Sequence, residues 1–76
     1  MKLIEKILNE RRMRNGVIIS NGDILKEECE ALGLKSDNII RRMIRGDNTD
    51  GVANGTVVKI ERRYGYSFEE LIDEVK

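Results

Sequence analysis

The segment from residue 25 to residue 45, LKEECEALGLKSDNIIRRMIR, constrains the fold more than any other part of the chain. Its apolar residues recur at helical spacing on both sides of Gly33, and glycine readily adopts the left-handed conformation that ends a helix. These apolar residues are Leu25, Cys29 and Leu32 before the glycine and Ile39, Ile40, Met43 and Ile44 after it. Gly46 is placed to end the second helix in the same way. Two apolar-faced helices joined at a glycine predict a helix-turn-helix.

The rest of the chain predicts an all-α fold, a compact bundle of about five short helices forming a single domain over residues 1–76. Apolar stripes place the helices at about 2–14, 24–32, 37–45, 56–64 and 68–75. Ser20 and Ser67 each begin a capping-box pattern, and Ser36 is expected to cap the third helix. Because only three of the 76 residues are aromatic, branched aliphatic side chains must fill most of the core.

Two segments leave an alternative open. Residues 17–19 are three β-branched residues between two Asn-Gly pairs, at 15–16 and 21–22, and they form either a short extended segment or a buried loop. The first of these pairs is a natural stop for the first helix. Residues 46–55 read as a polar connecting loop, and a strand is the rival structure for residues 56–64, because Asn-Gly before Thr-Val-Val is also a hairpin signal.

The chain has no net charge, but its charges are sorted into blocks. Residues 1–15 carry five basic and two acidic residues, and residues 35–63 carry seven basic and four acidic residues. The two intervening blocks, 16–34 and 64–76, each carry one basic and four acidic residues. One face can therefore be basic in a neutral molecule, although solvated helices alone would also account for these charges.

Individual charged residues are also assigned to helix faces. The arginines at 11, 12 and 14 suit the negative end of the first helix dipole. In the second helix Glu27, Glu28 and Glu30 are expected on the outer side, and in the fourth helix Lys59, Arg62 and Arg63 are expected to point outward. The third helix projects its arginines away from its apolar side, which indicates phosphate groups or base edges as their target.

Composition argues against catalysis and against a bound metal or cofactor. The chain has no histidine and one cysteine, Cys29, which is expected to be a small core residue. No nucleophile–base pair or carboxylate couple is recognisable, so we expect neither an enzyme nor a small-molecule substrate. No apolar run approaches the roughly 20 residues of a membrane span, and no signal peptide is recognisable, which indicates a cytoplasmic protein.

A calcium-binding loop is a competing reading of residues 50–61. Asp50, Asn54, Gly55 and Glu61 occupy positions of an EF-hand loop, but Val52 stands where a ligand oxygen is required. A connecting loop followed by a helix is therefore the preferred interpretation.

Three stretches resemble one family: Glu-Ala-Leu-Gly-Leu at residues 30–34, Ile-Arg-Gly at 44–46, and Ile-Glu-Arg-Arg-Tyr-Gly-Tyr-Ser-Phe-Glu-Glu-Leu at 60–71. Over about residues 23–75 the chain is similar to the Cro/repressor (XRE-type) helix-turn-helix DNA-binding domains, with their lambda-repressor-like fold. The chain departs from the family pattern in four ways. It has an insertion at residues 17–22 and one extra residue between Gly33 and Gly46. It also lacks the usual glutamine at the start of the second helix, and it has Glu28 where an apolar residue is usual.

The resemblance implies a sequence-specific DNA-binding transcriptional regulator of phage-repressor type that acts as a homodimer on double-stranded DNA. Its third helix would enter the major groove, while the start of the second helix and the loop after the third would contact the backbone. Bases would be read by Asn38, Arg41 and Arg42, and phosphates would be contacted by Lys35, Ser36, Arg45 and Lys59. The alternative is a small helical protein–protein interaction module, an adaptor or inhibitor that does not bind DNA.

Overall fold

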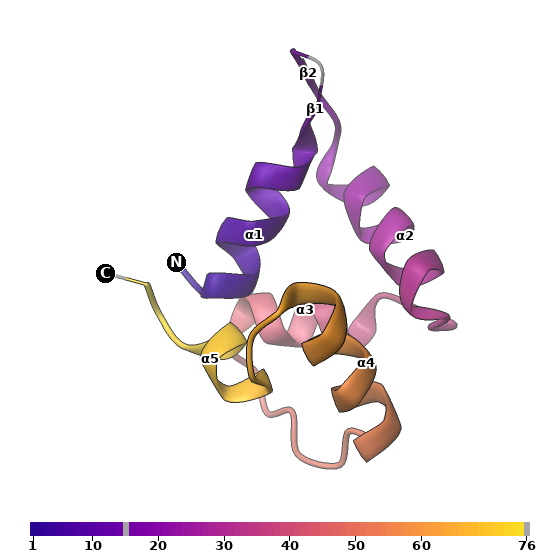
Figure 1. Cartoon of the computed structure of the whole chain (residues 1–76), viewed down its shortest axis with the longest axis vertical. Helices are drawn as coiled ribbons and strands as arrows, with labels where there is room; N and C mark the ends of the chain where they lie inside the picture. Colours follow the sequence, from indigo (N-terminus) through magenta and orange to yellow (C-terminus); the bar gives the residue numbers. More distant parts are fainter. Residues whose placement is uncertain (15, 76) are drawn as a thin grey trace.

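A computed structural model of the chain describes residues 1–14 and 16–75. These residues form helices α1 (Leu3–Arg12), α2 (Asn21–Leu32), α3 (Asn38–Arg45), α4 (Asn54–Tyr64) and α5 (Phe68–Ile72). Between α1 and α2, strands β1 (Met13–Arg14) and β2 (Val17–Ile18) pair as an antiparallel hairpin. In Figure 1, α1 and α2 diverge from this hairpin, and α3, α4 and α5 lie across their open end. The predicted small all-α bundle is confirmed.

The hairpin replaces the end of the first predicted helix. At Met13 the backbone turns to φ −95° and ψ 98°, so α1 stops at Arg12 rather than at residue 14. Met13 pairs with Ile18, and the Ile19 N–H donates to the Arg12 carbonyl at 3.0 Å. Of the two structures left open for the β-branched segment, it thus forms the extended one, and it pairs with the residues at the end of α1. Of the predicted helix stop, Asn15 lies outside the described residues, and Gly16 has φ +77°.

One core takes side chains from all five described helices, and the predicted apolar stripes supply it. Ile40 and Met43 of α3 are fully buried, as are Ile60 of α4 and Leu71 of α5. The other buried apolar residues are Ile4, Leu8, Ile24, Leu25, Cys29, Leu32 and Tyr64. The face of α3 that meets this core is therefore fixed by packing.

Local signals set most helix ends. The side chains of Ser20 and Ser67 accept hydrogen bonds from Asp23 N and Glu70 N, as the capping patterns predict. Gly33 and Gly46 both have a left-handed backbone, φ +71° and +74°. At Gly33 the turn closes with a 2.9 Å bond from Leu34 N to the Cys29 carbonyl, the Schellman pattern.

The starts of α3 and α4 differ from the prediction. Asp37, not Ser36, is the N-cap of α3, and its carboxylate pairs with Arg41 instead of capping the helix. α4 begins at Asn54, within the predicted loop, so residues 54–61 are helical. Glu61 accepts a 2.7 Å hydrogen bond from Phe68 N, and the calcium-loop interpretation does not match this helix.

α5 ends at Ile72 rather than at residue 75, because the following segment pairs with the start of the chain. Leu3 N donates to the Asp73 carbonyl at 3.0 Å, and Val75 N donates to the Met1 carbonyl at 2.8 Å. Lys2 and Glu74 form an isolated antiparallel bridge between the two ends. These backbone bonds hold the segment extended.

Glu28 is the largest departure from the predicted faces, because its side chain is 0% exposed rather than on the outer side of α2. Its Oε1 accepts from Arg11 Nη1 of α1 at 2.7 Å, and its Oε2 accepts from Arg63 Nη2 of α4 at 2.5 Å. Arg63, predicted to point outward, thus turns inward. We call these three residues the Glu28 clamp, since they join three helices.

The clamp keeps its central carboxylate charged. Burial raises the pKa of Glu28, but the hydrogen bonds from Arg63 and the positive charges of Arg11 and Arg63 outweigh burial and lower it. The Arg11 guanidinium also lies over the Tyr64 ring, 4.9 Å from its centroid. Burial, followed by the charge of Glu28, raises the pKa of Tyr64, so its hydroxyl stays neutral.

Candidate nucleic-acid interface

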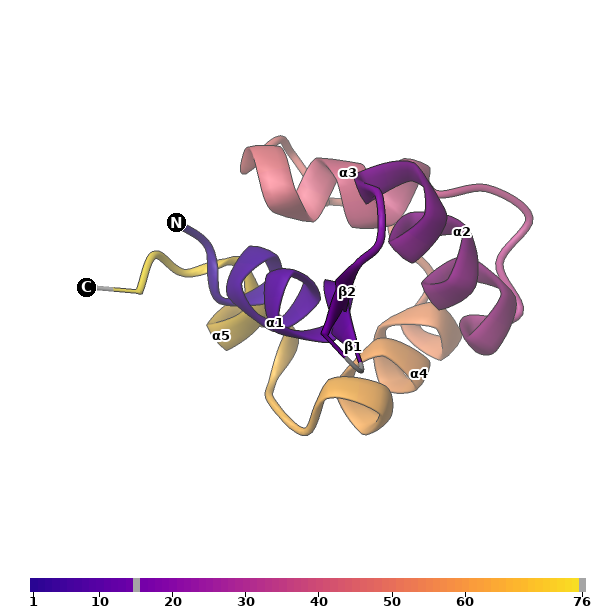
Figure 2. The ribbon, with the colours of Figure 1, turned by 90° about the horizontal axis from the view of Figure 1, so that it is seen from above.

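α3 carries the most concentrated set of predicted contact residues. Its successive residues are about 100° apart around the helix axis, which places four exposed side chains on the side opposite Ile40 and Met43. The four are Asn38, Arg41, Arg42 and Arg45. Figure 2 shows α3 along one edge of the molecule, on the opposite side from α4. The structure therefore brings together four of the seven predicted residues.

Two of these arginines are held by aspartates near them in sequence. Arg41 Nε lies 2.8 Å from Asp37 Oδ2, and Arg45 Nε lies 2.8 Å from Asp47 Oδ2. Both pairs are solvent-exposed, so each contributes at most about 1 kcal/mol and is screened by salt. A phosphate or a guanine edge can therefore compete with these aspartates for the arginines.

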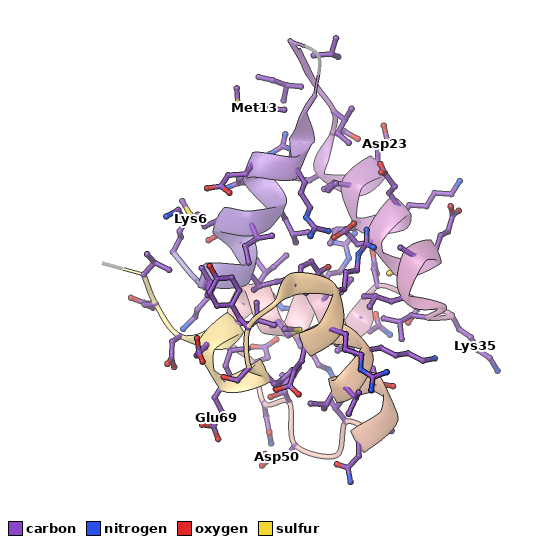
Figure 3. The ribbon with its side chains drawn as sticks, viewed as in Figure 1. Lys6, Met13, Asp23, Lys35, Asp50 and Glu69 are labelled. Atoms are coloured by element: carbon purple, nitrogen blue, oxygen red, sulfur yellow. The ribbon has the colours of Figure 1, made fainter. Side chains whose placement is uncertain are left out.

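Lys35 and Ser36 lie in the turn between α2 and α3, and both are exposed. Figure 3 shows Lys35 projecting outward from this turn. They therefore flank the start of α3, as a backbone-contacting pair would.

Lys59 is not on the α3 surface. It lies on α4 beside the end of α2, where a Cβ built on Gly33 would be 4.0 Å from its Nζ. There it borders a shallow depression together with Arg62 and Arg63. Spacing within α4 predicts that Lys59 is exposed, but only the packing of α4 against α2 decides which face of the molecule it occupies.

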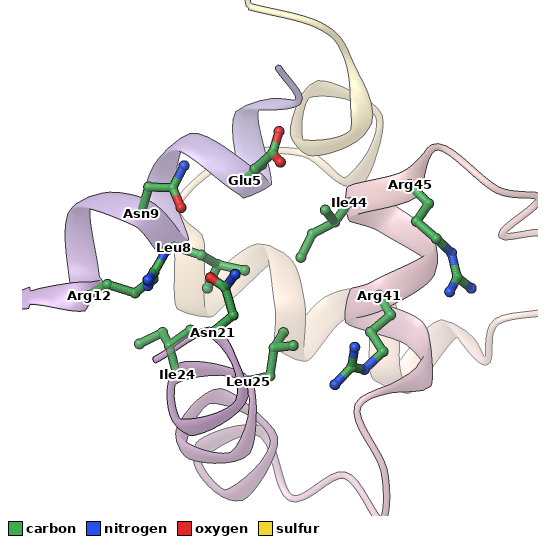
Figure 4. A pocket seen from close by; sticks show the side chains of 10 residues that line it. All are labelled: Glu5, Leu8, Asn9, Arg12, Asn21, Ile24, Leu25, Arg41, Ile44 and Arg45. Carbon is green, nitrogen blue, oxygen red and sulfur yellow. The ribbon is translucent and has the colours of Figure 1, made fainter. Parts of the chain in front are cut away.

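A hollow of about 240 Å³ lies beside α3, between α1 and the start of α2. We call it the α1–α3 groove. Arg41, Ile44 and Arg45 form its α3 wall. The remaining lining residues are Glu5, Leu8, Asn9, Arg12, Asn21, Ile24 and Leu25, as Figure 4 shows.

Sequence reasoning missed the α1 side of this groove. Glu5, Asn9 and Arg12 have spacing i, i+4 and i+7, which places them on one face of α1, so a signal was available. The sequence relates Arg12 only to the helix dipole, whereas in the structure its Nε also donates to the Ile19 carbonyl at 2.8 Å. That bond anchors the side chain to the segment that follows β2.

Cys29 behaves as the core residue that the sequence predicts. Its side chain is buried, and burial, with a contribution from the charge of Asp37, raises the pKa of the thiol. It is therefore a thiol rather than a reactive thiolate at neutral pH.

Comparisons with protein-family models, curated proteins and solved structures found no match to this chain. Among the described residues, no helix has the length and apolar character needed to cross a membrane.

Proposed function

We propose that the protein is a sequence-specific DNA-binding transcriptional regulator of the Cro/repressor (XRE-type) class, with α3 in the major groove. The observation that carries this proposal is the division of α3 into two sides. One side is anchored by fully buried Ile40 and Met43, and the other exposes one asparagine and three arginines. A rigid helix with these side chains suits bidentate recognition of adenine and guanine.

Within this proposal Asn38, Arg41 and Arg42 read base edges, because they lie on the exposed side of the first two turns. Arg45, at the end of α3, positions the helix on phosphate. Lys35 and Ser36 contact the backbone at the entrance to α3. Lys59 contributes to the long-range electrostatic attraction of DNA and makes no contact beside α3, because it lies against Gly33.

We propose that the protein acts as a homodimer in the cytoplasm. One domain of this size makes few contacts, and two copies on a two-fold related site supply the affinity that one lacks. No catalytic role, cofactor, metal or small-molecule substrate is part of the proposed activity.

Fluorescence anisotropy with a labelled mixed-sequence duplex tests the proposal. We expect micromolar binding at low salt and a log–log salt slope of roughly −0.9 for each phosphate contact. Arg41→Ala together with Arg42→Ala should abolish this binding. Arg62→Ala together with Lys6→Ala is the matched control, because it also removes two exposed positive charges, which lie on α4 and α1 rather than on α3.

Equal losses of DNA affinity in the two double variants would show that the total positive charge of the protein, and not α3, governs binding. Absence of binding by the unmodified protein at the lowest salt would refute DNA recognition by this chain.

The second candidate function is a protein–protein interaction module. The observation that favours it is the hairpin, where Met13, Val17 and Ile18 are 67%, 61% and 66% exposed. Exposed apolar side chains of this size suit a protein partner better than DNA phosphate. A hairpin variant, Val17→Thr with Ile18→Thr, should weaken capture of such a partner and leave DNA affinity unchanged.

A further inference from the structure

The α1–α3 groove combines an apolar floor with a positively charged wall. Leu8, Ile24, Leu25 and Ile44 form the floor, and all four also belong to the core or pack against it. Around this floor stand the guanidinium groups of Arg12 and Arg41 and the amides of Asn9 and Asn21. Glu5 supplies the one acidic side chain among the lining residues. The groove is therefore a concave site that has both apolar and anion-binding surfaces.

The two guanidinium groups are held in place while most of their donors remain available. Arg12 is held through Nε by the Ile19 carbonyl, and Arg41 is held through Nε by Asp37. An arginine presents five N–H donors in a planar fork, so the terminal nitrogens of both side chains can still donate. In Figure 4 the Arg41 guanidinium points toward Leu25 and the start of α2, whereas that of Arg45 turns away from the hollow.

An isolated phosphate would satisfy only part of this site. The arginines and asparagines offer donors to an anion, but the floor beneath them offers only apolar contact. A ligand that matches both surfaces carries a phosphate or carboxylate attached to a small apolar body. The volume of about 240 Å³ lies just below the usual range of small-molecule pockets and admits a compact molecule of this kind.

We propose that the α1–α3 groove binds a small amphipathic anion, with its charged group on Arg12 and Arg41 and its apolar body on the floor. Part of this inference rests on the function proposed above. Because Arg41 also lies on the DNA-facing side of α3, the ligand and DNA compete for it, and ligand binding lowers DNA affinity.

Phenyl phosphate is the probe, since it joins a phosphate to an apolar ring, and inorganic phosphate is the matched ligand without the ring. Each is titrated into ¹⁵N-labelled full-length protein, without DNA, and amide and arginine Nε–H signals are followed by NMR. We expect saturable shifts for Asn9, Asn21 and Arg41 with phenyl phosphate, and affinity at least tenfold weaker for inorganic phosphate.

Two variants test the location. Arg41→Ala should weaken phenyl phosphate binding tenfold or more, and Arg62→Ala, an exposed change on α4, should alter it less than twofold. Retention of binding in Arg41→Ala, shifts centred on α4, or the absence of a saturable shift would each overturn the groove assignment. Equal affinities for the two anions would overturn the amphipathic ligand and leave only the phosphate contact that a nucleic-acid backbone also makes.

The competition between the ligand and DNA is measured separately by fluorescence anisotropy. Saturating phenyl phosphate should lower the DNA affinity of the unmodified protein at least threefold, with inorganic phosphate at the same ionic strength as the control. An unchanged DNA affinity would refute the competition. If the protein binds no DNA at all, the proposed regulator fails, whereas the NMR titration still decides the groove.

Discussion

Replacing Glu28 with glutamine is the most informative test of how the fold is held together. The substitution keeps the shape of the side chain and removes its charge. Arg63 Nη2, 2.5 Å from Oε2, would then face an amide NH₂, a donor opposite a donor. Arg11 and Arg63 would also lose the anion that balances them.

The expected loss of stability in Glu28→Gln follows from the burial of the Glu28 carboxylate. Breaking a buried ion pair by removing one partner costs about 3–5 kcal/mol. The Arg11 and Arg63 side chains are 31% and 29% exposed and can partly turn to water, which favours the lower limit, about 3 kcal/mol. For a domain of this size such a loss corresponds to a decrease in Tm of roughly 12–24 °C.

The assay is urea unfolding followed by circular dichroism at 222 nm, with the free energy of unfolding extrapolated to water. Glu30→Gln is the matched control, because Glu30 is exposed on the same helix. Its effect should stay within about 0.5 kcal/mol. A double-mutant cycle with Arg63→Met should show that this second change costs less once Glu28 is already glutamine.

The reasoning would be refuted by a Glu28→Gln protein as stable as the Glu30→Gln control. Additive effects of Glu28→Gln and Arg63→Met would likewise show that the two side chains do not stabilise the fold through each other.

The remaining predictions also concern stability. The folded-state pKa of Glu28 lies below its ordinary value of 4.5, so the clamp contributes its full stabilisation above pH 4.5. This contribution is lost as the pH falls through the folded-state pKa. Urea unfolding at decreasing pH should therefore show a shrinking difference in stability between the unmodified and Glu28→Gln proteins. Gly33→Ala should destabilise by about 1–2 kcal/mol, because φ is +71°. Gly22→Ala should stabilise the fold by up to about 1 kcal/mol, because Gly22 is helical and a Cβ there meets nothing within 4 Å. Equal effects of Gly33→Ala and Gly22→Ala in thermal melts would contradict this reasoning. Ser20→Ala should lower stability by about 1 kcal/mol, because the Asp23 N–H would lose the hydroxyl oxygen to which it donates. Faster hydrogen exchange in the first turn of α2 would detect this loss.

The Glu28 clamp shows where prediction from sequence stopped. Glu28 lies four residues after Ile24 and four before Leu32, so helical spacing already places it on the apolar stripe of α2. Its charge led to the opposite assignment, because an unpaired carboxylate is rarely buried. Its partners are 17 and 35 residues away in the chain, and no local pattern relates residues at such separations.

The predicted DNA-contact residues also divide into those that local spacing could group and those that only packing could place. Spacing within α3 was enough to group Asn38, Arg41, Arg42 and Arg45 on one side, because they share a single helix. Spacing within α4 predicts only that Lys59 is exposed, and the packing of α4 puts it beside Gly33 rather than beside α3. The α1 wall of the groove was missed for the same reason, since it meets α3 only in three dimensions.

The sequence by itself determined the features whose causes are local. The apolar stripes, the serine caps and the left-handed glycines involve residues within about one or two helical turns, so their energetics are encoded in short stretches. Only the tertiary structure decided the hairpin partner of Val17–Ile18, the pairing of the two chain ends, the Glu28 clamp and the groove beside α3. Each of these depends on groups that approach one another only after the helices have packed, and burial and distance then set which charges are paired.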